Sequence, residues 1–222
     1  MTLVKQTAFQ RYLSILRFHG LSNGPRRAWE QFSQVDLYDY LHGIETRLLV
    51  TVEARDPGGV SNYGPNYTAS SERPLRRLIS TCPEMGSTRL AFIDLGCGKG
   101  KVLHVAKRVL PRAKLFGVDL HPGILETTRK NLGEAATLVN ANVLDVDYAS
   151  LLGPQDVIVV FNKNSFDRAT VETTLARIKA CAPAVFYIYS NPVYGDLFAC
   201  YQEVFSMTGW HKNWQVKAWK VR

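Results

Sequence analysis

Residues 92–103 read Phe92-Ile93-Asp94-Leu95-Gly96-Cys97-Gly98-Lys99-Gly100-Lys101-Val102-Leu103, and they carry more information than any other segment of this 222-residue chain. An apolar run ends in an acid, three alternating glycines follow, and an amphipathic pattern of helical period comes next. Glycines at a strand-to-helix turn let the backbone approach a ligand closely, and the first helical turn offers unpaired N–H groups. A dinucleotide-binding turn requires G-x-G-x-x-G, whereas this turn is G-x-G-x-G, one residue shorter. The segment therefore predicts a ligand-binding strand–turn–helix unit of another kind.

From residue 90 onward, apolar runs of strand length alternate with amphipathic segments. This alternation is typical of a parallel sheet with helices on both faces, so we predict an α/β fold. The predicted strands are 90–95, 114–119, 137–142, 156–161 and 184–189, and the predicted helices between them are 99–110, 122–133, 146–152 and 167–180. We expect a final helix over 193–206, followed by two paired strands over 207–213 and 214–222.

The N-terminal region is basic and predicts helices. No acid precedes Glu30, whereas five basic residues do: Lys5, Arg11, Arg17, Arg26 and Arg27. Residues 8–18 have apolar residues at helical spacing, Ser22-Asn23-Gly24-Pro25 is expected to break that helix, and 28–51 resume the apolar spacing around Trp29, Phe32, Leu37 and Leu41. We favour a helix that packs beside the main domain. An organelle transit peptide, or a surface for membrane or nucleic acid, remains open.

Turn-forming residues separate this region from the main domain. Residues 56–66 are rich in Gly, Pro and Asn and indicate an ordered loop or a lid hinge. Ser71 is expected to cap a helix that has Pro74 in its first turn. We therefore predict an N-terminal helical extension and lid over 1–64 and a second domain over 65–222.

Composition places the chain among ordinary globular proteins, with 46% apolar and 21% charged residues. Its four cysteines form no C-x-x-C pair, which argues against a zinc site or a disulfide framework and favours a reducing, cytoplasmic location. No apolar run reaches the length of a membrane span. The net charge of +8 permits an anionic partner without requiring one.

The segment Asp94-Leu95-Gly96-Cys97-Gly98-Lys99-Gly100 resembles motif I, D-x-G-x-G-x-G, of the class I S-adenosylmethionine (SAM)-dependent methyltransferases. The resemblance implies a seven-stranded, mostly parallel, doubly wound sheet with an N-terminal helical extension, and SAM as the cofactor. It also implies that Asp94, Gly96, Cys97 and Gly98 bind SAM. Tyr67 lies where the family has a segment that caps the cofactor.

Two further strand ends extend the resemblance. Phe116-Gly117-Val118-Asp119 ends in an acid 25 residues after Asp94, and in the family this acid binds the SAM ribose, with the next two positions, Leu120 and His121, against the adenine. The alternative for Asp119 is a simple strand-end cap. Asn142 holds the place of the residue that accepts from the adenine amine, and the N–H of Val143 would donate to the ring. Asp145 is the alternative to Asn142.

The segment Phe161-Asn162-Lys163-Asn164-Ser165-Phe166 stands at the position of motif IV, beside the reactive methyl group. It resembles the F-N-P-F motif of a broad bacterial group without a defined substrate, and Asn191-Pro192 matches a second Asn-Pro of that group. The resemblance implies that Asn162 binds the cofactor and orients the nucleophile, with Asn164 as the rival. Lys163, in place of the motif's proline, could hold an acidic substrate or be solvated.

Methyl transfer from SAM needs alignment more than a protein nucleophile. No general base is evident near motif IV, which favours nitrogen over oxygen as the acceptor atom, on a protein or a small molecule. Two alternatives remain open. One is an RNA methyltransferase, for which the basic positions Lys99, Lys101, Lys107, Arg108, Arg112 and Lys114 could be the footprint. The other is a SAM-binding pseudoenzyme that acts as an interaction or nucleic-acid-binding module.

Overall fold

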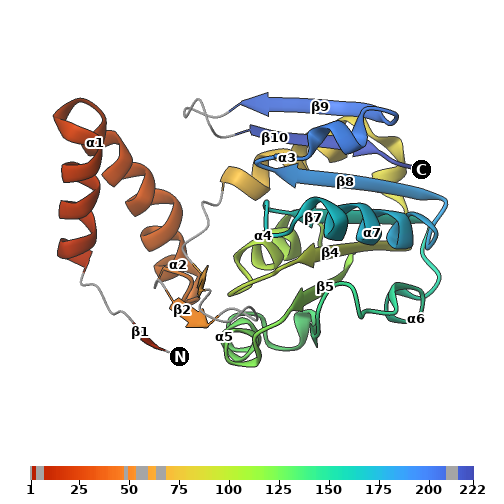
Figure 1. Ribbon diagram of the computed structural model, residues 1–222, viewed down its shortest axis with the longest axis horizontal. Coiled ribbons are helices and arrows are strands. Elements are labelled where there is room, and N and C mark those ends of the chain that lie inside the picture. The colour runs from red at the N-terminus through yellow and green to blue at the C-terminus, as the bar shows by residue number, and fades with distance from the viewer. Residues whose placement is uncertain (1, 4–7, 48–49, 54–59, 64–68, 209–214) are drawn as a thin grey trace. The chain divides into compact units, whose positions relative to one another are not determined.

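The structure, a computed structural model, describes residues 2–3, 8–47, 50–53, 60–63, 69–208 and 215–222. The chain divides into two units, Met1–Ala69 and Ser70–Arg222, and each is described by itself. Figure 1 shows the helices of the first unit and the large sheet of the second. Within the described residues, no helix has both the length and the hydropathy to cross a bilayer.

The first unit contains a long helical segment and a small sheet. Its elements are α1 (Ala8–Gln31), the π-helical η1 (Phe32–Asp36), α2 (Leu37–His42), β1 (Thr2–Leu3), β2 (Val50–Glu53) and β3 (Val60–Tyr63). The predicted break over 22–25 is wrong, because the kink lies earlier, at Gly20, whose φ is +69°. Pro25 lies five residues after this kink, inside α1. The three-stranded antiparallel sheet β1-β2-β3 was not predicted.

Polar contacts hold the helices of the first unit together. Tyr12 Oη donates to Asp36 Oδ2 over 2.6 Å. The buried carboxylate of Asp39 accepts from the N–H and the hydroxyl of Thr46 at 2.7 and 2.8 Å. The expected apolar face over 28–51 is only partly buried, because Trp29 and Leu41 are exposed.

The second unit is built on the predicted seven-stranded sheet, whose order is β6-β5-β4-β7-β8-β10-β9. The strands are β4 (Leu90–Leu95), β5 (Lys114–Asp119), β6 (Thr137–Asn140), β7 (Val157–Asn162), β8 (Ala184–Ser190), β9 (Gln202–Thr208) and β10 (Gln215–Lys220). The first five are parallel to one another, and β10 is antiparallel to both β8 and β9. The predicted α/β fold with a mostly parallel sheet is confirmed.

Helices cover this sheet on both faces, with α7 in front of it and α3 behind it in Figure 1. They are α3 (Ala69–Thr81), α4 (Lys101–Val109), α5 (Pro122–Leu132), α6 (Tyr148–Leu152) and α7 (Arg168–Lys179), with short 3-10 turns η2 (Pro83–Gly86), η3 (Gly133–Ala135) and η4 (Gly195–Phe198). Local signals explain their starts. Asp147 and Asp167 cap α6 and α7 by accepting from backbone N–H groups, and Pro122 opens α5.

The predicted final helix over 193–206 is wrong. Only the 3-10 turn η4 forms there, and Gln202 already begins strand β9. Along β9 only Phe205 is buried, and most of the other residues are exposed, as expected for an edge strand. Pairing with β10 overrides the helical spacing, and the final strand pair starts about five residues earlier than predicted.

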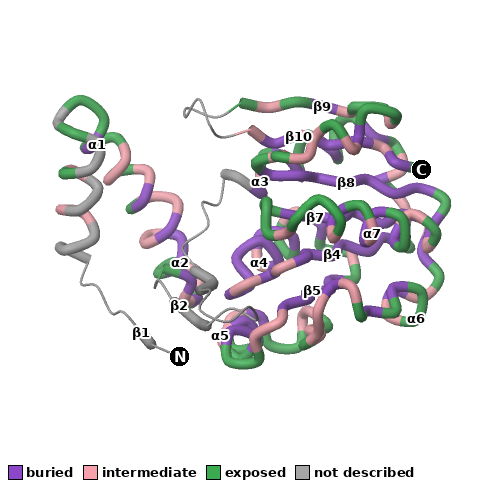
Figure 2. The backbone as a smooth tube through the Cα atoms, viewed as in Figure 1, coloured by how far each residue is buried: buried purple, intermediate pink, exposed green. Residues whose placement is uncertain are grey.

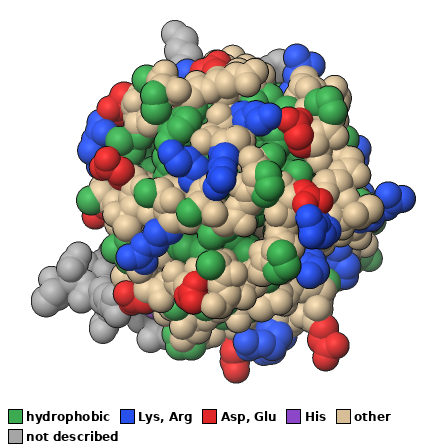
Figure 3. Space-filling model, turned by 90° about the vertical axis from the view of Figure 1, so that its right-hand side faces the viewer, with side chains coloured by type: hydrophobic (Ala, Val, Ile, Leu, Met, Phe, Trp, Pro, Cys, Tyr) green, Lys and Arg blue, Asp and Glu red, His purple; other side chains and the backbone are tan. Residues whose placement is uncertain are grey.

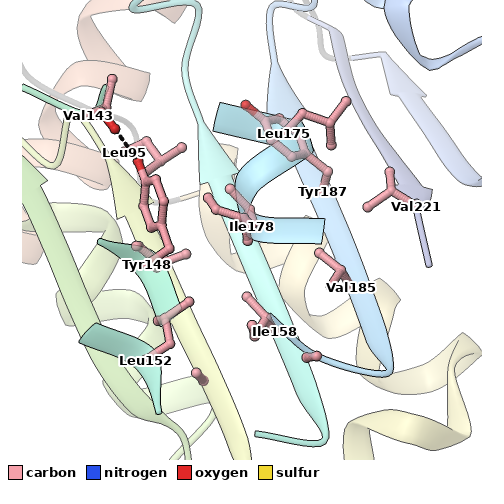
Figure 4. Close-up of a cluster of buried hydrophobic side chains, with 14 of the residues drawn as sticks. Leu95, Val143, Tyr148, Leu152, Ile158, Leu175, Ile178, Val185, Tyr187 and Val221 are labelled. Atoms are coloured by element: carbon pink, nitrogen blue, oxygen red, sulfur yellow. Dashed lines mark hydrogen bonds between the residues drawn. The ribbon is translucent and has the colours of Figure 1, made fainter. Parts of the chain in front are cut away.

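The core lies along the central strands, which are buried over their whole length (Figure 2). On one face, side chains of α6 and α7 pack against β4, β7 and β8 (Figure 4). Tyr148 reaches through this cluster and donates to the carbonyl oxygen of Val143 over 2.7 Å. This contact connects the core to the loop that follows β6.

Ile158→Ala tests this core. Ile158 is fully buried on β7, so its truncation is expected to lower the free energy of unfolding by about 2–5 kcal/mol. Val193→Ala is the control, because 61% of Val193 is exposed and the change should stay within about 0.5 kcal/mol. Urea denaturation measures both, and equal stability of the two variants would contradict the packing described.

Candidate functional site

The carboxyl ends of the parallel strands form the candidate site. From β4 the sheet extends through β5 and β6 on one side and through β7 and β8 on the other. In open α/β sheets, ligands bind outside the carboxyl ends where the strand order reverses in this way. The loops that follow β4, β5, β6 and β7 therefore surround one position, and the predicted site residues lie in these loops.

The glycine loop, residues 96–100, turns over the end of β5. The N–H groups of Gly96 and Cys97 both donate to the carbonyl oxygen of Val118, at 2.9 and 3.0 Å. Gly96, Gly98 and Gly100 all have positive φ, between +53° and +79°, a region that side chains with a Cβ rarely adopt. The turn therefore depends on glycine at these three positions.

Helix α5 supports the glycine loop through residues that sequence reasoning missed. The Thr128 hydroxyl donates to the carbonyl oxygen of Gly98, and Asn131 Nδ2 donates to that of Lys99 over 2.8 Å. A Cβ on Gly100 would lie 2.6 Å from the Thr128 methyl group, so glycine also permits this packing. A signal was present, because Thr128 interrupts the apolar stripe of α5 and is fully buried.

Asp119 connects the glycine loop to the end of β5. Its Oδ2 accepts from the Gly98 N–H at 2.9 Å, and its Oδ1 accepts from the His121 N–H at 3.1 Å. Asn140 Nδ2 donates to the carbonyl oxygen of Leu120 over 2.8 Å, which holds the next residue in place. A carboxylate oxygen has two lone pairs, so the role as a strand-end cap and the binding of a diol are compatible.

Asn142 and Val143 begin the loop that follows β6. Asn142 Oδ1 accepts from the Leu144 N–H at 3.0 Å, and this Asx turn orients the side chain. Val143 is buried, and its carbonyl oxygen is held by Tyr148. The alternative residue, Asp145, is exposed.

Asp94 is buried at the end of β4, and its Oδ2 has no hydrogen-bond partner among the residues that the structure describes. Burial, together with the neighbouring Asp119, raises the pKa of this carboxyl to about 8, and Lys163 opposes the shift. A buried carboxylate oxygen without a partner is costly unless a cation or donor reaches it. The arrangement therefore favours a ligand that carries positive charge.

The loop after β7 lies against the glycine loop. Asn162 pairs with Leu95 in the sheet and is fully buried, and its Nδ2 donates to Tyr187 Oη over 3.3 Å. Its Oδ1 accepts from the Ser165 N–H at 3.4 Å. A Cβ on Gly96 would lie 3.3 Å from the Ser165 side chain, so the two loops meet there. The side chain of Asn162 therefore holds the loop after β7 where it meets the glycine loop.

The structure brings most of the predicted residues to one edge of the sheet. These are Asp94, Gly96, Cys97, Gly98, Asp119, Leu120, His121, Asn142, Val143 and Asn162, which lie at the ends of β4 to β7 or in the loops that follow. Asn164 is also in the loop after β7, but it is exposed and has a φ of +43°. Tyr67 lies outside the described residues.

Comparison with known proteins agrees with this geometry. Residues 92–182 match a family model described as a methyltransferase domain. This part of the chain is thus similar to a methyltransferase domain. It extends from β4 past α7, so it includes the glycine loop, Asp119 and Asn162. The resemblance to class I methyltransferases, whose methyl donor is SAM, is confirmed for the domain and its fold.

Among relatives of this domain are two enzymes named malonyl-[acyl-carrier protein] O-methyltransferase. That of Priestia megaterium is 22% identical over 127 residues, which cover 56% of this chain and 46% of the relative. That of Acetivibrio thermocellus is 23% identical over 149 residues, which cover 64% of this chain and 52% of the relative. The chain thus spans about half the length of each relative.

Solved structures share the fold of the methyltransferase domain. The N-methyltransferase NodS of Bradyrhizobium japonicum superposes with a TM-score of 0.50 at 12% identity, over 68% of this chain and 96% of that chain. The bifunctional kinase-methyltransferase WbdD gives a TM-score of 0.50 at 17% identity, and the match covers 70% of this chain and 40% of that chain. At such identities the likeness concerns the fold alone.

The buried carboxyl of Asp94 predicts a pH-dependent stability. The folded protein keeps this proton up to about pH 8, whereas an ordinary Asp releases it near its usual pKa of 3.8. The free energy of unfolding should therefore decrease as the pH rises from about 4 to about 8, by several kcal/mol for a shift of this size. Asp94→Asn should remove this decrease, as measured by urea denaturation across that range.

The control for this experiment is Asp145→Asn, which makes the same chemical change at an exposed position. It should retain the pH dependence of the wild-type protein. If Asp94→Asn also retains it, the carboxyl of Asp94 is not the group that titrates with folding.

Proposed function

We propose that this protein transfers the methyl group of SAM to an acceptor molecule. The observation that carries the proposal is the glycine loop, bound to Asp119 through Gly98 and adjacent to the unpartnered carboxylate oxygen of Asp94. SAM supplies, when bound, a methyl group on a positively charged sulfur that is already a good leaving group. The protein's own part is to bind, to align and to exclude water.

The residues at the carboxyl edge fit SAM. The methionine portion carries an ammonium group, which the buried Oδ2 of Asp94 would bind, and this would also relieve the cost of burying that carboxylate. Asp119, whose carboxylate already accepts from two backbone N–H groups, would also accept from the ribose diol. Leu120 and His121 on one side, and Asn142 with Val143 on the other, would enclose the adenine.

The loop that follows β7, described over 163–167, contains no histidine, and this limits the kind of acceptor. His121 stands at the position before α5, and His104 lies within α4, so neither follows β7, where the acceptor is expected. The acceptor atom must then be nucleophilic without losing a proton to the protein. Nitrogen, which the sequence favours, meets this condition, and so does a carboxylate oxygen. The name of the relatives, as O-methyltransferases of a malonyl group, supports oxygen as the second candidate.

The alternative of an RNA methyltransferase finds less support. Two of the six basic residues in its expected footprint, Lys99 and Lys101, are buried and so would not meet a phosphate backbone. On the face of the molecule in Figure 3, basic side chains are interspersed with acidic ones and make no continuous stripe. The pseudoenzyme alternative is disfavoured by the presence of both Asp94 and Asp119.

SAM and its product S-adenosylhomocysteine (SAH) should each raise the melting temperature of the protein, and NAD should not. A ligand that binds only the folded state stabilises it by mass action. Differential scanning calorimetry with the three ligands measures this. A larger shift with NAD than with SAM would contradict the proposed cofactor.

Asp119→Ala should weaken SAH binding by about 1.5–3 kcal/mol, the usual value of a hydrogen bond to a charged group. The loss has two sources, because Asp119 both anchors the Gly98 N–H and would accept from the ribose. Isothermal calorimetry of the folded variant measures it, with the exposed Asp145→Ala as the control. If SAH affinity is unchanged in the variant, Asp119 acts only as a strand-end cap.

Asn162→Ala should lower the turnover of methyl transfer more than it lowers SAH affinity, because the amide holds the loop beside the reacting methyl group. It should also cost about 1–3 kcal/mol of stability, since Tyr187 Oη and the Ser165 N–H lose their partner. Asn164→Ala is the matched variant in the same loop. A larger loss of turnover in Asn164→Ala would transfer the proposed role to Asn164.

A further inference from the structure

The hydroxyl group of Tyr187 is buried on the face of the sheet that α7 covers. The Tyr187 side chain is fully buried within the cluster formed by β4, β7, β8, α6 and α7 (Figure 4). Its Oη accepts over 3.3 Å from Nδ2 of Asn162, which is the last residue of β7. Tyr187 therefore connects the core to the residue from which the loop after β7 begins.

The two hydrogen bonds of Asn162 fix which end of its amide faces which neighbour. The backbone N–H of Ser165 can only donate, so the amide oxygen must face it, and Oδ1 does so at 3.4 Å. The amide nitrogen then faces Tyr187 Oη, which has lone pairs to accept from it. The opposite orientation would place Nδ2 against the Ser165 N–H, two donors without an acceptor. Both bonds are long, so the amide depends on the pair of them rather than on one.

Burial makes this arrangement sensitive to the loss of either partner. Asn162 is fully buried, so water does not replace a lost hydrogen bond. A buried polar group without a partner is costly, and a side chain that can rotate turns toward another partner. Without the hydroxyl group of Tyr187, the amide would lose its acceptor for Nδ2 and the constraint that keeps Oδ1 on the Ser165 N–H.

Burial also limits what the hydroxyl group of Tyr187 can do chemically. It raises the pKa of Tyr187 well above the ordinary value, and the hydrogen bonds with Asn162 and Thr174 offset only part of the rise. The hydroxyl group therefore stays protonated at physiological pH and does not take a proton from an acceptor. Its role is to orient Asn162.

The position of Ser165 matters because the loop after β7 touches the glycine loop there. A Cβ on Gly96 would lie 3.3 Å from the Ser165 side chain and 3.5 Å from the Phe166 ring. The two loops are thus in van der Waals contact, and a shift of one is transmitted to the other. A displacement of about 1 Å at a reacting group can lower a rate about 100-fold.

We propose that Tyr187 is a positioning residue for methyl transfer. Its hydroxyl group orients the amide of Asn162, and Asn162, through the Ser165 N–H, sets where the loop after β7 lies against the glycine loop. The proposal rests on the proposed methyltransferase function, in which this loop lies beside the reacting methyl group. Tyr187 itself acts only through Asn162.

Hydrogen exchange of single backbone amides, followed by NMR, tests the connection from Tyr187 to Ser165 without any acceptor. Tyr187→Phe removes only the hydroxyl group, and the Ser165 N–H should then exchange about 3- to 10-fold faster, as expected when one hydrogen bond weakens. The Thr170 N–H, which donates to Asp167 at the start of α7, should keep its wild-type rate. An unchanged rate at Ser165, or equal acceleration at both positions, would overturn the proposal.

Tyr189→Phe is the matched control variant. Tyr189 is also buried, lies two residues further along β8 on the same face, and pairs with Asn162 in the sheet. Its Oη has no hydrogen bond to Asn162 within the described part of the chain. Ser165 should therefore exchange at the wild-type rate in this variant. If Tyr189→Phe accelerates exchange at Ser165 as much as Tyr187→Phe does, the specific role of Tyr187 is wrong.

A second measurement needs no variant, so it applies even if Tyr187→Phe does not fold. In the wild-type protein, nuclear Overhauser effects from the side-chain NH₂ group of Asn162 should be stronger to the ring of Tyr187 than to the Ser165 N–H. The reverse pattern would show the opposite orientation of the amide and would overturn the proposal.

Methyl transfer tests the effect on the reaction. Initial rates are measured with tritium-labelled SAM at varied concentration and a soluble cell extract as the source of acceptor. Tyr187→Phe should lower the maximal rate about 10-fold and change the KM for SAM by less than about twofold. In the Asn162→Ala background it should cause no further loss, because it acts through that amide.

Multiplied losses in the double variant would show that Tyr187 acts independently of Asn162, which would overturn the proposal. SAH binding by the wild-type protein, measured by calorimetry, tests the methyltransferase function separately. Absence of both SAH binding and methyl transfer would contradict that function, whereas transfer with unchanged exchange at Ser165 in Tyr187→Phe would contradict only the role of Tyr187.

Discussion

The hydrogen bond from the Gly98 N–H to the carboxylate of Asp119 is the contact on which the rest of the site depends. It joins the loop after β4 to the end of β5, across the position where the strand order reverses. The bond is possible because Gly98 adopts a positive φ that directs its N–H toward β5. Thr128 and Asn131 hold the same loop from the side of α5. The backbone of the loop is thus bound from two directions before any ligand arrives, which reduces the ordering that binding requires.

Two charged groups at the edge of the sheet illustrate how burial prepares a binding site. Asp94 has lost its water without gaining a partner for Oδ2, so its neutral form is favoured. Lys163 has kept access to solvent while losing part of its hydration. The burial of Asp94 costs stability in the free protein, and a ligand of opposite charge would relieve it. The site is therefore complementary to a cation near β4, which is the charge that the methionine ammonium of SAM would supply.

Prediction from sequence succeeded where the local pattern and the tertiary environment agree. Strands β4 and β5 begin and end at the predicted residues, because continuous apolar runs have no stable alternative to a buried parallel strand. It failed where a distant partner decides the structure. Residues 202–208 form a strand because β10 pairs with them. Support from Thr128 and Asn140 was missed for the same reason, since each bonds to a segment distant in sequence. The kink in α1 is a different, local case, since Gly20 and not 22–25 has the non-helical φ and ψ.

By itself, the sequence determined the class of fold, the glycine loop and the acids at the ends of β4 and β5, because these depend on backbone conformation and strand period within short segments. Only the tertiary structure decided which of these groups have partners. Asp119 proves to be bound by two N–H groups, Asn162 is committed to Tyr187 and Ser165, and Ser190 is buried without a partner among the described residues. The physical reason is that desolvation and hydrogen bonding are properties of a residue's neighbours in space, and strand register brings together neighbours that the linear pattern does not identify.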